Sequence, residues 1–91
     1  MVTEQEITVL VEEGRRKEAI VLLEKYLEEQ GQEETILLRL GELIYAEGRM
    51  PDALNKFNAV LRLNPDNQKA RNYVTMIQGI LGYYCKDLFN P

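Results

Sequence analysis

The side chains of this chain that could do chemistry are adjacent carboxylates, one short basic cluster and a single thiol. Pairs such as Glu12-Glu13 and Glu28-Glu29 have the residue type used for general acid/base catalysis. Neighbouring residues on a helix diverge by about 100°, however, so such pairs do not face one another. Cys85 has no histidine to activate it, because the chain contains none. We therefore expect a solvated acidic face, a structural thiol and no enzyme activity.

The composition also argues against bound cofactors. Without histidine, and with one cysteine, the chain lacks the commonest metal-ligand sets and cannot form an intramolecular disulfide. It carries no glycine-rich phosphate loop and no nucleophile motif. We expect neither a metal nor another cofactor.

Charge and hydropathy limit the partners. The net charge of -4 argues against nucleic acid, whose binding depends on clustered Lys and Arg. The basic cluster Arg15-Arg16-Lys17 is flanked by Glu12, Glu13 and Glu18, so we interpret it as a solvated turn with its charges neutralised locally. No apolar run is long enough to cross a membrane, and the acidic start does not resemble a signal peptide. We expect a cytoplasmic protein.

Apolar residues at helical spacing predict five helices, separated by glycine or proline. The expected ranges are 3–13, 16–29, 33–47, 51–63 and 68–85. Thr3 and Glu6 fit a capping box at the first helix start. The third helix is apolar around most of its circumference, which places it at the centre of the domain.

An internal repeat is the strongest signal. Glu13-Gly14-Arg15 recurs unchanged as Glu47-Gly48-Arg49, which gives a period of 48 − 14 = 34 residues. Ala19 recurs as Ala53 at the same shift. A helix pair repeated at this period is typical of stacked helical repeats.

The second copy, 34–67, resembles the tetratricopeptide repeat. The residues that carry this resemblance are Leu37, Leu40, Gly41, Ile44, Gly48, Ala53, Phe57, Val60 and Pro65. The resemblance implies an all-α fold: a right-handed α-α superhelix of about two and a half repeats in a single domain, 1–91. Residues 1–33 would form a degenerate first repeat, with Ile7 in place of the small Gly41.

The third copy, 68–91, is incomplete. Its apolar stripe passes Gly79 and Gly82 without losing phase, so we expect one long C-terminal capping helix followed by a tail. The alternative is a break at Gly82 with a short last helix from Tyr83.

The resemblance also implies a protein-interaction module that binds a peptide or helix of a partner in a concave groove. Arg39, Glu42 and Tyr45 lie on one face of an otherwise apolar helix, although Leu38 and Tyr45 could instead serve packing alone. The expected groove residues are Glu4, Thr8, Thr35, Leu38, Arg39, Glu42, Tyr45, Lys69, Asn72, Tyr73 and Met76.

One subclass of the family grips the terminal carboxylates of chaperone tails with Lys, Asn and Arg side chains. At the matching positions only Lys69 agrees, and Glu4 would repel a carboxylate. We therefore do not expect a carboxylate-clamp binder of chaperone tails.

The aromatic C-terminal part is the remaining feature. Its apolar residues are Tyr83, Tyr84, Leu88 and Phe89. Either they fold back as a cap on the last helices, or they make the chain a self-associating homodimer or assembly unit. The identity of any partner does not follow from these residues.

Overall fold

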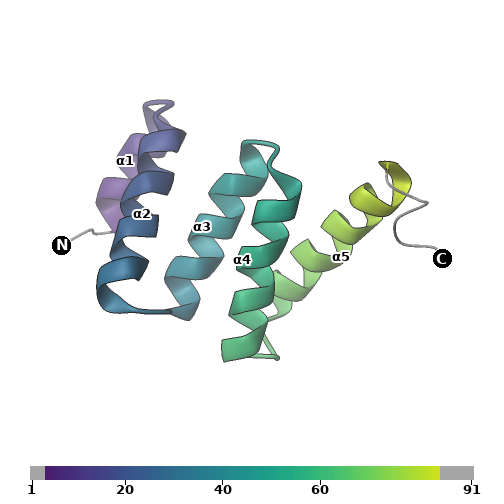
Figure 1. Ribbon diagram of the computed structural model, residues 1–91. Coiled ribbons are helices and arrows are strands. Elements are labelled where there is room, and N and C mark those ends of the chain that lie inside the picture. Colours follow the sequence, from purple (N-terminus) through teal and green to yellow (C-terminus); the bar gives the residue numbers. More distant parts are fainter. Residues whose placement is uncertain (1–3, 85–91) are drawn as a thin grey trace.

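The computed structural model describes residues 4–84, with Tyr83 and Tyr84 described by their backbone alone. The described part is all-α, as the sequence predicts, and holds five helices in chain order (Figure 1). They are α1 (Glu4–Glu12), α2 (Arg16–Gln30), α3 (Glu34–Ala46), α4 (Met50–Leu63) and α5 (Gln68–Tyr84). Each begins and ends within one or two residues of its expected bounds. Thr3 of the predicted capping box lies outside the described residues.

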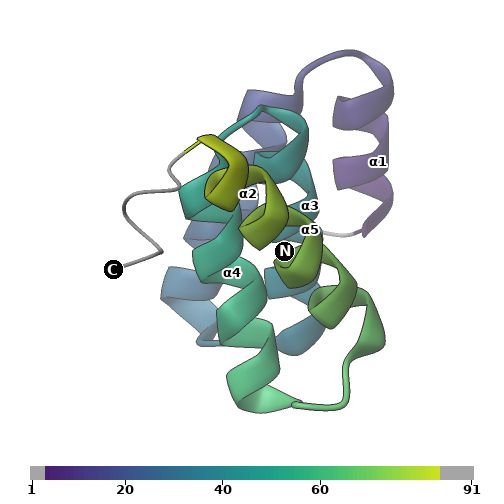
Figure 2. The ribbon, with the colours of Figure 1, turned by 90° about the vertical axis from the view of Figure 1, so that its right-hand side faces the viewer.

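The helices form an elongated stack in which each packs against the next along the chain. The described chain measures 45 × 28 × 21 Å, with α1 at one end and α5 at the other (Figure 1). Seen along the stack, α1, α3 and α5 lie toward one side and α2 and α4 toward the other (Figure 2). This arrangement separates a surface made by the first helices of the pairs from one made by the second helices.

The two Glu-Gly-Arg segments form the same tight turn. Gly14 and Gly48 have φ values of 77° and 82°, the left-handed conformation that favours glycine. In the second turn Gly48 donates its backbone N–H to the Tyr45 carbonyl, at 2.9 Å, and Arg49 donates to Ile44, at 3.2 Å. The first turn repeats both bonds 34 residues earlier. This pattern is a Schellman motif, which satisfies the last carbonyls of α1 and α3.

The core runs through the whole stack, and α3 contributes most to it. Buried apolar side chains come from all five helices: Ile7, Ala19, Ile20, Leu23, Leu27, Leu37, Leu40, Leu43, Ile44, Ala53, Phe57, Ala59, Val60, Ala70 and Ile77. Its closest approach is between Gly41 of α3 and Phe57 of α4, where a Cβ on Gly41 would lie 2.8 Å from the ring. In the first copy Ile7 and Leu23 occupy the equivalent places and both are buried. A small and a large residue are thus replaced by two of intermediate size, which keeps the packed volume similar.

The last helix is continuous. It passes Gly79 and Gly82 and reaches Tyr84, so the chain does not break at Gly82. Leu88 and Phe89 lie outside the described residues, as do the side chains of Tyr83 and Tyr84. The predicted self-cap and tail-mediated dimer remain predictions.

Candidate functional site

Two first helices of the pairs, α3 and α5, place polar and aromatic side chains on one surface. We call this the α3–α5 surface and define it by Arg39, Glu42, Tyr45, Lys69 and Tyr73. The helical spacing of three or four residues puts Arg39, Glu42 and Tyr45 on one side of α3, and Lys69 and Tyr73 on one side of α5. All five belong to the predicted groove set.

Glu42 ties the two helices together. Its Oε2 atom lies 3.1 Å from the Lys69 ammonium and accepts a hydrogen bond of 3.3 Å from the Tyr73 hydroxyl. The Glu42 side chain is only 18% exposed, so this contact is partly shielded from solvent. Lys69, the single match to the carboxylate clamp, is thus engaged by a carboxylate of the chain itself.

Three aromatic rings support the same surface from beneath. Tyr73 stacks on Phe57, with ring centroids 4.4 Å apart and planes 4° from parallel, and meets Tyr45 edge to face at 5.3 Å. Burial is the main reason that the pKa of Tyr73 is raised, and the Glu42 charge raises it further. Tyr73 therefore stays a neutral hydrogen-bond donor.

Arg39 is the exception among these polar groups. Its Nε atom is buried and has no hydrogen-bond partner, and no described acidic side chain forms an ion pair with its guanidinium. Glu42, one turn further along α3, is already bonded to Lys69 and Tyr73. Buried donors are normally satisfied, so this one calls for an explanation.

The other residues expected in the groove divide into exposed and packed ones. Thr35, Lys69, Asn72 and Met76 are exposed, whereas Leu38 and Tyr45 pack partly against the core. Asn72 accepts a hydrogen bond of 2.9 Å from Gln68 on the same helix. On α1, Glu4 is exposed and its carbonyl accepts a bond of 2.9 Å from the Thr8 hydroxyl.

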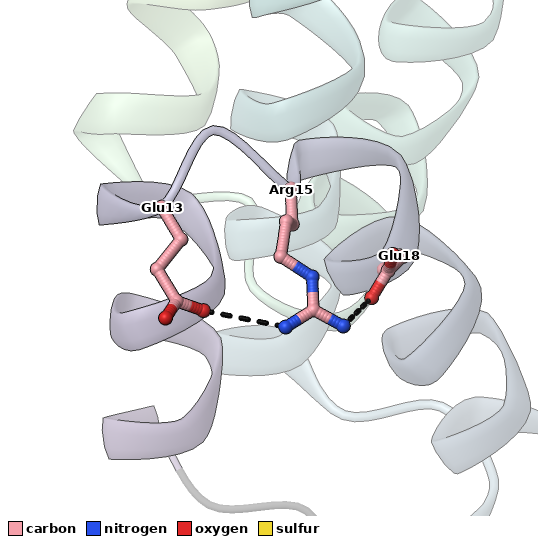
Figure 3. A network of polar contacts seen from close by, with 3 residues as sticks. All are labelled: Glu13, Arg15 and Glu18. Carbon is pink, nitrogen blue, oxygen red and sulfur yellow. Dashed lines mark hydrogen bonds and ion pairs between the residues drawn. The ribbon is translucent and has the colours of Figure 1, made fainter.

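The basic cluster is occupied by structural ion pairs. Arg15 bridges Glu13, at 3.3 Å, and Glu18 across the first turn (Figure 3). The hydrogen bond from Arg15 to Glu18 also raises the pKa of the guanidinium. The expectation of local neutralisation holds for Arg15 but not for Arg16, which pairs instead with Glu47 of the second turn at 3.2 Å.

A polar link that the sequence analysis missed connects the start of α3 to the start of α5. Glu34 Oε2 accepts hydrogen bonds from Asn67, at 2.6 Å, and from Asn64, at 2.8 Å. These bonds lower the pKa of Glu34, with Asn67 contributing most. Asn67 also caps α5, because its Oδ1 accepts the Ala70 backbone N–H at 2.9 Å. The only signal in the sequence was the position of Asn67 directly before a helix.

The described residues contain no group of three or more His, Cys, Asp or Glu side chains that could hold a metal ion. Among the helices described, none is long and apolar enough to span a bilayer. The α3–α5 surface offers hydrogen-bonding and charged groups around aromatic rings, an arrangement suited to holding a ligand rather than transforming it.

Stacked helix pairs with a 34-residue period and identical turns define a helical-repeat solenoid. The comparison with family models agrees: the tetratricopeptide repeat model matches residues 10–72. The chain belongs to the tetratricopeptide repeat family.

One curated relative gives a further comparison. The chain is 36% identical over 59 residues to anaphase-promoting complex subunit 7 of Arabidopsis thaliana. The match covers 65% of this chain but only 10% of the relative, so the chain spans a small part of that protein. No solved structure matches significantly.

Proposed function

We propose that this chain is a non-enzymatic protein-interaction module that binds a short segment of a partner protein across the α3–α5 surface. Tetratricopeptide repeats generally mediate protein–protein interaction. The curated relative is, by its name, a subunit of a complex. Both comparisons support a protein as the partner, and the surface itself suggests which side chains meet it.

The observation that carries the proposal is the unsatisfied Nε of Arg39. Leaving a buried donor unpaired costs about 1–3 kcal/mol, and a partner that supplies an acceptor recovers part of this cost on binding. Since Glu42 is already bonded to Lys69 and Tyr73, the Arg39 charge is left for an acidic side chain of the partner. Exposed Met76 and half-buried Leu38 add apolar surface on the same two helices.

A peptide-display selection on the purified chain tests this proposal. We expect the selected peptides to contain Asp or Glu, and Arg39→Glu to weaken their binding by at least about tenfold, because like charges would then face each other. Arg62→Glu is the matched control: the same change on an exposed arginine of α4, on the other side of the stack (Figure 2). Peptides that bind Arg39→Glu as tightly as wild type would rule out the α3–α5 surface as the binding site.

A further inference from the structure

The two ends of the helix stack differ in chemistry. At the N-terminal end, α1 exposes the side that α3 buries. Val9 of α1 is 45% exposed, whereas Leu43, its equivalent 34 residues later, is 4% exposed. Both helices pack on their own second helix, but only α3 has a preceding helix, α2, against it. The exposure of Val9 therefore measures what a preceding helix would cover.

The uncovered side forms an open, mainly apolar hollow between α1 and α2. Val9, Leu10 and Leu22 supply its apolar surface, and Glu6, Glu13 and Arg15 lie around it. Arg15 neutralises Glu13 and also holds Glu18, which fixes the turn between the two helices at the edge of the hollow (Figure 3). The repeat uses polar residues at some of its end positions, but Val9 is not among them.

The C-terminal end is polar at the positions where another helix would pack. Leu37, Gly41 and Ile44 of α3 are buried, but their equivalents on α5 are the exposed residues Arg71, Thr75 and Gln78. Thr75 donates its hydroxyl hydrogen to the Arg71 carbonyl on its own helix. This end of the described chain is adapted to water, as the last helix of a solenoid needs to be.

We propose that the N-terminal end faces of two copies of this chain pack against each other about a two-fold axis. A head-to-tail contact would bury Arg71 and Gln78 against Val9 and Leu10, which is costly because the polar groups lose water without gaining partners. A contact of like ends covers apolar surface with apolar surface and closes after two copies. It also leaves the α3–α5 surface accessible, because α1 and α5 lie at opposite ends of the stack (Figure 1).

Sedimentation equilibrium over a range of concentrations of the full chain tests the dimer. We expect a monomer–dimer equilibrium that Val9→Lys shifts at least about tenfold toward monomer, because a lysine at the contact would be buried without a counter-charge. Leu63→Lys is the control: it places the same charge at a 50%-exposed leucine at the end of α4 and should leave the equilibrium unchanged. Circular dichroism checks that both variants remain helical.

Disulfide cross-linking then tests which face is used. In a Cys85→Ser background, oxidised Val9→Cys should give covalent dimers, and Leu63→Cys should give far fewer. A wild-type chain that stays monomeric at every concentration overturns the proposal. So does a dimer that persists in Val9→Lys, one that Phe89→Asp alone abolishes, or one that Val9→Cys links no better than Leu63→Cys.

Discussion

Gly41 is the residue that sets how closely the central helix pair approaches. Phe57 is fully buried, and its ring is held on its other side by the stacked ring of Tyr73. The ring therefore has little room to move away from an added methyl group. A glycine in the middle of a helix costs about 1 kcal/mol relative to alanine, and here the close packing of Phe57 offsets that cost.

Gly41→Ala should consequently lower the free energy of unfolding by about 1–2 kcal/mol. The added Cβ would lie 2.8 and 2.9 Å from two atoms of the Phe57 ring, and such overpacking outweighs the gain in helix propensity. Urea denaturation measures the change. The control is Gly79→Ala on α5, where nothing lies within 4 Å of the new Cβ and we expect stabilisation by up to about 1 kcal/mol. Equal effects of the two substitutions would contradict this account.

At the scale of the helices, Glu34 and Asn67 join the beginnings of α3 and α5. The Asn67 amide group acts at both ends, because its oxygen caps α5 while its nitrogen donates to Glu34. The relative placement of these two helices determines the α3–α5 surface. We therefore regard this polar link as a support of the candidate site.

The lowered pKa of Glu34 predicts how stability responds to acid. A carboxylate whose folded pKa lies below its unfolded value of about 4.5 stabilises the fold fully above that pH, and this contribution is lost as the pH falls through the folded pKa. Glu34→Gln should therefore flatten the fall in unfolding free energy below about pH 4.5. Denaturation at a series of pH values, with Glu24→Gln on exposed α2 as control, measures this. An unchanged acid limb in Glu34→Gln would show that the bonds from Asn64 and Asn67 do not hold the charge.

The helices themselves could be predicted from the sequence because their signals are local. Apolar spacing and left-handed glycines such as Gly48 act over a few residues, and the 34-residue period relates the two turns. Links over 30 residues or more could not be predicted. The pairing of Arg16 with Glu47 and the isolation of the Arg39 Nε depend on which rotamers the packed helices allow. The surface was therefore predictable as a set of residues, but not its bonded and unbonded members.

At the scale of the whole molecule, burial is uneven along the stack. In α1 one side chain, Ile7, is buried among nine residues, whereas α3 buries five of its thirteen. A stack in which each helix packs mainly on its neighbours has a stability close to a sum of neighbour terms. The helix with the smallest such term should open first.

Hydrogen exchange of the Val9→Lys chain tests this order, because that variant is expected to be monomeric and leaves Ile7 in place. Amides in α1 should exchange at least about tenfold faster than those in α3 and α4, since opening α1 exposes one buried side chain and leaves the Gly41–Phe57 contact intact. In the wild-type chain, protection of α1 should rise with protein concentration if the end faces pair, while α3 serves as the internal control. Protection of α1 equal to that of α4 in the monomeric variant would show that the stack opens as one cooperative unit, and the neighbour-by-neighbour description would then be wrong.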